Sequence, residues 1–258
     1  ERLAALLARH GIVETANTDQ PVWCAGQATL VVAGDFIDKG PSSLACIDFL
    51  RALQSAAERQ GGRVVVLMGN HEAEFLADPR NRKAEGPWGI NREIVAAGQT
   101  PEAVARGDDG RGAWLRALPF GARVGRWFFS HAGDTHGRDV SALEKALRAD
   151  VDAHDFKGEE VVGKASLLCS RLWYEADAAL ASRFATALGV DHIGFGHDPK
   201  ALGPRGRIAI GPGRTLVRID CGMSRRVDDS RGGLLRVRNV AGAEVIEACY
   251  ADGTVTRL

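Results

Sequence analysis

The sequence predicts an α/β (α+β) fold in a single domain, residues 1–258, and three observations support it. Four apolar runs end beside a glycine and a polar residue, as buried strands do: residues 30–41, 63–72, 124–133 and 190–199. Segments with helical periodicity alternate with these runs. The 258 residues are 45% hydrophobic and 26% charged, which suits a globular chain with one large core.

The other elements follow from local patterns. Helices are predicted over residues 1–10, 42–59, 141–149 and 176–188, where apolar residues recur at helical spacing. A short strand is predicted at residues 22–24. Residues 73–118 are the least regular part and are expected to form lid or insert loops with short helices. The tail, residues 207–258, predicts short strands that form a second sheet facing the first.

Polar side chains stand at the ends of all four long apolar runs. They are Asp35, Asn70, His131 and His197. Open α/β sheets bind ligands at the carboxyl ends of their strands, so we expect these side chains to converge. Mixed oxygen and nitrogen donors suit divalent manganese, iron or zinc better than calcium. The pattern indicates a metal site, and a turn residue or a core histidine is the alternative for each residue taken alone.

Four motifs, taken in order, resemble those of the calcineurin-like metallophosphatases. They are Gly34-Asp35-Phe36-Ile37-Asp38, Gly69-Asn70-His71-Glu72, Ser130-His131-Ala132-Gly133 and Gly196-His197-Asp198-Pro199. The wider pattern is similar to the phosphoprotein phosphatase branch and, through residues 111–119 and 219–224, to the bacterial Shewanella-like phosphatases. The resemblance extends from residue 1 to about residue 238.

This resemblance implies a four-layer αββα sandwich with two facing mixed β-sheets. It also implies two divalent metal ions, with manganese expected in preference to iron or zinc. Asp35 would bridge the ions, because one carboxylate offers two oxygens, and Asn70, His131 and His197 would complete the second position. The implied reaction is the hydrolysis of phosphate monoesters through attack by a metal-bound hydroxide.

His71 and Asp38 are the implied catalytic pair. His71 would protonate the leaving alcohol, while Asp38 would hold the other ring nitrogen. A structural histidine is the alternative. Glu72 is expected to accept hydrogen bonds that close a loop.

Lys39, Arg171 and Asn70 are the candidates for binding the phosphoryl group. The family usually has Arg where Lys39 stands, and Lys offers a point charge in place of a planar fork. A solvated lysine is the alternative. Arg171 lies just before a Leu-Trp pair, whereas the subgroup often has its Arg after the aromatic pair, where this sequence has Glu175.

The first metal position is where this sequence departs from the family. The family's first strand ends in Asp-x-His-Gly, and no such motif precedes the helix over residues 1–10. We therefore expect an upstream strand with this motif in the native polypeptide. Asp134 and His136 spell the same motif after the third run, and they provide the alternative of a permuted site.

The expected substrate is a phosphorylated protein side chain or a small phosphorylated molecule. A nucleotide or dinucleoside polyphosphate hydrolase is the enzymatic alternative, and a non-catalytic scaffold is the other. With 33 basic and 33 acidic residues, no surface for nucleic acid or membrane is expected. Five cysteines without CxxC spacing indicate free buried thiols and a cytoplasmic location, although an upstream segment could carry a signal peptide. The oligomeric state stays open.

Overall fold

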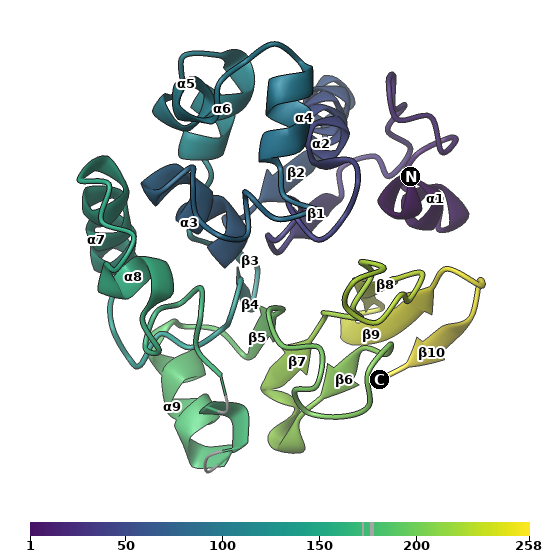
Figure 1. The fold of residues 1–258 in the computed structure, drawn as a ribbon. Coiled ribbons are helices and arrows are strands. Elements are labelled where there is room, and N and C mark those ends of the chain that lie inside the picture. The colour runs from purple at the N-terminus through teal and green to yellow at the C-terminus, as the bar shows by residue number, and fades with distance from the viewer. Residues whose placement is uncertain (172, 176–177) are drawn as a thin grey trace.

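The computed structural model describes residues 1–171, 173–175 and 178–258, and Figure 1 shows their arrangement. The helices are α1 (Arg2–Arg9), α2 (Ser43–Arg59), α3 (Asn70–Ala77), α4 (Asn91–Ala96), α5 (Pro101–Arg106), α6 (Gly110–Arg116), α7 (Val140–Asp152), α8 (Glu159–Val162) and α9 (Ala178–Ala187), with 3-10 turns η1 (Trp173–Glu175) and η2 (Pro212–Arg214). The strands are β1 (Thr29–Val32), β2 (Arg63–Val66), β3 (Gly121–Val124), β4 (Trp127–Ser130), β5 (His192–Phe195), β6 (Ala209–Ile210), β7 (Leu216–Arg218), β8 (Gly233–Val240), β9 (Ala243–Tyr250) and β10 (Val255–Arg257).

The described strands form three hydrogen-bonded sheets, and the predicted mixed α/β class is confirmed. β1 and β2 form a parallel pair. Five strands form a mixed sheet in the order β3-β4-β5-β7-β6, in which β4, β5 and β7 run parallel. The remaining three, β10-β9-β8, are antiparallel. Helices flank these sheets, with α2 packed on β2 and α1 against β8 (Figure 1).

The tail forms a facing sheet only in part. A small core of Trp127, Ile208, Val217, Cys221, Ile246, Ala248 and Tyr250 fills the space between the five-stranded sheet and the sheet of β8, β9 and β10. The predicted second sheet is therefore present. The prediction was wrong for β6 and β7, which join the five-stranded sheet. All residues of β7 are buried, and such a strand belongs inside a sheet that is covered on both faces.

The third predicted run, residues 124–133, contains a strand and the turn before it. β4 confirms the strand that precedes His131, but Val124 belongs to β3, which pairs antiparallel with β4 across a tight turn and places Val124 opposite Trp127. Gly125 lies in the turn at a φ of 58°, a left-handed conformation that glycine adopts without steric cost. The prediction was therefore wrong only for the first residues of the run, because the turn has no polar cluster to mark it.

The helix predictions over residues 1–10, 42–59 and 141–149 are confirmed by α1, α2 and α7. The predicted helix 176–188 is matched by α9 from Ala178 onward, and residues 176 and 177 lie outside the described residues. Residues 73–118 contain short helices, as expected, and several of their apolar side chains join the main core. None of the described helices combines the length and the apolar character needed to cross a bilayer.

Two smaller predictions had mixed outcomes. The strand expected at residues 22–24 is only an isolated bridge between Trp23 and Val13. All five cysteines are free, as predicted, but only Cys221 and Cys249 are buried. Cys46 and Cys169 are half-buried and Cys24 is exposed, so the prediction of buried thiols is confirmed only in part.

Candidate metal centre

The four strand ends converge where two sheets meet. Asp35 follows β1 and His131 follows β4 directly, while His197 stands two residues after β5. The carbonyl oxygen of Ala33, beyond β1, accepts a hydrogen bond of 2.6 Å from Nδ1 of His131. This contact joins the β1–β2 pair to the five-stranded sheet at the point where the polar side chains meet.

Two glycines allow this close approach. A Cβ added at Gly34 would lie 2.5 Å from the backbone nitrogen of Gly69, and one added at Gly69 would lie 2.4 Å from the nitrogen of Asp35. Both distances are shorter than any side-chain carbon tolerates. The loops after β1 and β2 therefore pack backbone to backbone, which places Asp35 beside Asn70 at the start of α3.

The predicted donor atoms lie close together. Oδ1 of Asn70 is 3.1 Å from Nδ1 of His197 and 3.3 Å from Nε2 of His131. Nε2 of His131 is also 3.2 Å from Nδ1 of His197 and 3.3 Å from Oδ1 of Asp35. The structure thus brings together all four residues that the sequence predicted as ligands.

These donors suit a divalent cation. Nδ1 of His131 faces a carbonyl oxygen and must donate to it, which aims Nε2 at the cluster. Burial lowers the pKa of His131, but the adjacent Asp35 outweighs this effect and raises it. A cation bound at Nε2 of His131 would compete with a proton there, as happens when metals bind to ionisable ligands.

The other donors keep their lone pairs available. Burial and the nearby His131 lower the pKa of His197 to about 3, so its imidazole is neutral near pH 7. Burial acts to raise the pKa of Asp35, but the charges of His131 and His71 hold it well below its ordinary value. A neutral imidazole and an ionised carboxylate are the forms that bind metals.

Glu72 closes the loop after β1, as the sequence predicted. Its fully buried carboxylate accepts backbone N–H bonds of 2.8–3.1 Å from Gly69 and residues 35–37. Burial and the charge of Asp35 raise the pKa of Glu72 to about 7, while these backbone bonds act in the opposite direction. Asp35, at a φ of 57°, is held in its unusual backbone conformation by this carboxylate.

His71 and Asp38 are paired as expected. Nδ1 of His71 lies 2.8 Å from Oδ2 of Asp38, whose Oδ1 accepts a bond from the backbone N–H of Ile90. Nε2 of His71 is buried, lacks a hydrogen-bond partner among the described residues, and lies 4.0 Å from Oδ2 of Asp35. A buried nitrogen without a partner at the edge of the cluster is placed to exchange a proton with a bound molecule.

The two cationic candidates for phosphate binding differ in their placement. Nη1 of Arg171 lies 3.4 Å from Oδ2 of Asp198, and Nη2 donates to the carbonyl oxygen of His197 at 3.4 Å. The guanidinium is therefore held beside a candidate metal ligand. Lys39 is exposed, and its carbonyl oxygen accepts a hydrogen bond from the Ser224 hydroxyl.

The permuted-site alternative finds no support in the geometry. Nε2 of His136 lies 3.0 Å from Oδ2 of Asp134, so the two residues pair with each other. Among the described residues, the group of acidic and imidazole donors that could hold a metal comprises Asp35, His131 and His197. Asp134 and His136 are outside it.

Sequence reasoning missed three charged residues near the centre. Glu74 and Lys83 pair at 2.6 Å next to Asn70, and Asp220 follows β7 with its pKa raised by burial. Asp220 obeys the same strand-end pattern as the predicted ligands. Glu74 stands four residues after Asn70, on the same face of α3.

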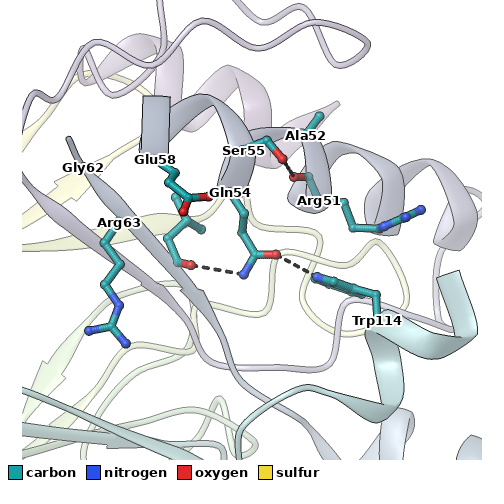
Figure 2. A pocket seen from close by; sticks show the side chains of 9 residues that line it. Arg51, Ala52, Gln54, Ser55, Glu58, Gly62, Arg63 and Trp114 are labelled. Atoms are coloured by element: carbon teal, nitrogen blue, oxygen red, sulfur yellow. Dashed lines mark hydrogen bonds between the residues drawn. The ribbon is translucent and has the colours of Figure 1, made fainter. Parts of the chain in front are cut away.

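A cavity of about 780 Å³ lies elsewhere, between α2, β2 and α6 (Figure 2). Gln54 lies across it, accepting from the indole N–H of Trp114 and donating to the carbonyl oxygen of Val64. None of its lining residues belongs to the donor cluster. Its size alone gives no reason to place the chemistry there.

The calcineurin-like phosphoesterase family model matches residues 3–201. The match includes all four motifs, and the chain belongs to this family. The fold agrees: a cold-active protein tyrosine phosphatase of a psychrophilic Shewanella species superposes with a TM-score of 0.77 at 20% identity, over 99% of this chain and 76% of that one.

Two curated relatives match shorter segments. Shewanella-like protein phosphatase 2 of Arabidopsis thaliana is 33% identical over 81 residues, which is 28% of this chain and 21% of the relative. A symmetrical bis(5'-nucleosyl)-tetraphosphatase of Janthinobacterium sp. (strain Marseille) is 31% identical over 109 residues, which is 42% of this chain and 34% of the relative. These matches therefore span between a fifth and about a third of the relatives' lengths.

Proposed function

We propose that this chain is a metal-dependent phosphatase that hydrolyses phosphate monoesters. The observation that carries the proposal is the buried Nε2 of His71, which has no hydrogen-bond partner in the described part of the chain and lies beside four converging donor atoms. A cluster with donors alone could be structural. The added proton-exchanging nitrogen supplies what ester cleavage needs, because the departing alkoxide must gain a proton.

Two divalent cations are proposed, manganese in preference to iron or zinc. One would be held by Asn70, His131 and His197 together with Asp35, and the other would share Asp35. Bound there, the cations would neutralise phosphoryl charge and lower the pKa of an attacking water. Asp35 lies between His131 and His71, with Oδ1 3.3 Å from Nε2 of His131 and Oδ2 4.0 Å from Nε2 of His71, so its carboxylate would be the group that both cations share.

The chain's own residues then have distinct roles. His71 donates the proton at Nε2 to the leaving oxygen as the phosphorus–oxygen bond breaks, and Asp38 fixes the ring through Nδ1. Arg171 and Lys39 bind phosphoryl oxygens. The Asn70 NH₂ group, the third candidate for this role, donates to Glu74 instead. The water oxygen forms the new bond to phosphorus, so the products are phosphate and an alcohol, and no phosphoenzyme is required.

A phosphorylated protein side chain is the proposed substrate, as the name of the plant relative suggests. The second candidate is hydrolysis of a dinucleoside polyphosphate, which the similarity to the tetraphosphatase favours. Both reactions use the same centre and differ in the group that leaves.

The test is manganese-dependent hydrolysis of p-nitrophenyl phosphate, followed by panels of phosphopeptides and dinucleoside polyphosphates. We expect hydrolysis that chelation abolishes and that His197→Ala lowers strongly. A matched control is His154→Ala, since His154 lies in the turn after α7. Bound manganese without hydrolysis of any of these phosphate compounds would refute the proposal and favour a non-catalytic scaffold.

A further inference from the structure

Glu74 joins a candidate metal ligand to a partly exposed cation. Its Oε1 accepts a hydrogen bond of 2.7 Å from Nδ2 of Asn70 and lies 2.6 Å from Nζ of Lys83. The Glu74 side chain is 6% exposed and that of Lys83 34%. A buried carboxylate thus contacts an amide on one side and an ammonium on the other.

The contact decides which end of the Asn70 amide faces the cluster. Carboxylate oxygens only accept hydrogen bonds, so the NH₂ group of Asn70 must point to Glu74. Its Oδ1 then points to His131 and His197. A reversed amide would present hydrogens to a cation, and Asn70 could not act as a ligand.

The negative charge of Glu74 affects Asn70 in addition to orienting its amide. A carboxylate that accepts from the amide N–H polarises the group and makes the carbonyl oxygen a stronger donor. Lys83 compensates the buried charge of Glu74, which would otherwise be costly. Lys83 is linked to Asn70 through Glu74, and Arg171 donates to the carbonyl oxygen of His197, so both cations lie next to candidate metal ligands.

We propose that Glu74 and Lys83 are positioning residues that couple metal affinity to phosphate affinity. Glu74 orients and polarises Asn70 as an oxygen ligand. Lys83 offsets the charge of Glu74 and, being partly exposed next to the cluster, supplies a positive charge that favours a bound phosphate. The inference rests on the proposed function, since it assumes that the cluster binds a cation and an anion together.

Metal affinity tests the role of Glu74. Metal-free protein is titrated with Mn²⁺ in a calorimeter, without any substrate. Glu74→Gln keeps the shape and removes the charge, and we expect binding weaker by about tenfold, the low end for residues that support metal ligands. Glu74→Leu also removes the acceptor and should weaken binding further. Glu14→Gln, at an exposed carboxylate, is the control and should bind Mn²⁺ as the wild type does.

Substitution of Lys83 should weaken phosphate binding but not Mn²⁺ binding, unlike the substitutions of Glu74. Lys83→Met keeps the aliphatic stem and leaves Glu74 uncompensated, so Mn²⁺ binding should be as tight as in the wild type or tighter. Binding of inorganic phosphate to the Mn²⁺-loaded protein should weaken by about fivefold, as expected for one partly exposed charge. Arg82→Gln removes the neighbouring exposed charge and is the control. A purely structural ion pair would weaken both affinities in the Glu74 and Lys83 variants alike.

The outcomes separate this inference from the proposed function. Unchanged Mn²⁺ affinity in Glu74→Gln and Glu74→Leu overturns the inference even if the wild type hydrolyses phosphate esters. If Glu74→Leu fails to fold, unchanged affinity in Glu74→Gln overturns it alone. A wild type that binds Mn²⁺ and phosphate but cleaves no ester refutes only the proposed function, and the affinity differences then still support the inference.

Discussion

Replacement of Glu72 by glutamine should destabilise the protein far more than its conservative chemistry suggests. Each carboxylate oxygen accepts two backbone N–H bonds: Oε2 from Asp35 and Gly69, and Oε1 from Phe36 and Ile37. Glutamine keeps one oxygen and replaces the other with an NH₂ group. Whichever way the amide turns, two buried N–H donors face another donor.

The size of the effect follows from the number of bonds. Hydrogen bonds to a charged group contribute about 1.5–3 kcal/mol each, so two lost bonds cost at least about 3 kcal/mol. For a chain of this size, that lowers the midpoint of thermal unfolding by roughly 6 °C or more. The midpoint of thermal unfolding should be measured at pH 8, where Glu72 is ionised because its pKa is about 7. A chelator in the buffer removes any contribution from bound metal.

Glu14→Gln is the matched control, because the exposed Glu14 carboxylate makes no hydrogen bond with the described residues. It should leave the midpoint unchanged. If Glu72→Gln also unfolds within about 2 °C of the wild type, less than about 1 kcal/mol is lost. That result would refute the view that Glu72 holds the loop carrying Asp35.

Three further predictions concern turnover. His71→Asn should keep metal content but slow alkyl phosphates by roughly 10²–10⁴, with smaller losses on aryl phosphates; equal losses would argue against proton donation. Lys39→Arg should tighten inhibition by inorganic phosphate and Lys39→Ala should weaken it; if neither changes inhibition, Lys39 is only a surface charge. Asp198→Asn should release Arg171 and raise KM for phosphate esters roughly threefold, with kcat less affected; a loss confined to kcat would show that Asp198 does not act through Arg171.

The strand-end residues were predictable because their pattern is local. An apolar run, a glycine and a polar residue specify a buried strand and a tight turn, and Asp35, Asn70 and His131 all follow this rule. Parallel strands then deliver such residues to one edge. The pairing of His71 with Asp38 came from the family resemblance, and the structure places the two side chains as expected.

Other features depend on contacts between distant segments. Nothing near β7 in the sequence indicates that it lies beside β5 and not in the tail sheet, because burial on both faces is a property of the assembled fold. The hairpin of β3 and β4 was hidden by a turn with few turn-forming residues. The contact of Glu74 with Lys83 depends on how the segment after α3 folds back, and helical spacing alone identifies only the Asn70 side of it.

The hydrogen bond from His131 to the Ala33 carbonyl oxygen marks the place where two units of the fold meet at the candidate metal centre. Asp35 and Asn70 belong to the unit built on β1 and β2, whereas His131 and His197 belong to the five-stranded sheet. A cation bound by all four would therefore tie two separately hydrogen-bonded units together. Such binding resists their separation by mass action, in proportion to the logarithm of the free cation concentration. Amide hydrogens along this seam should exchange faster when the metal is removed, while those deep inside each sheet keep their protection.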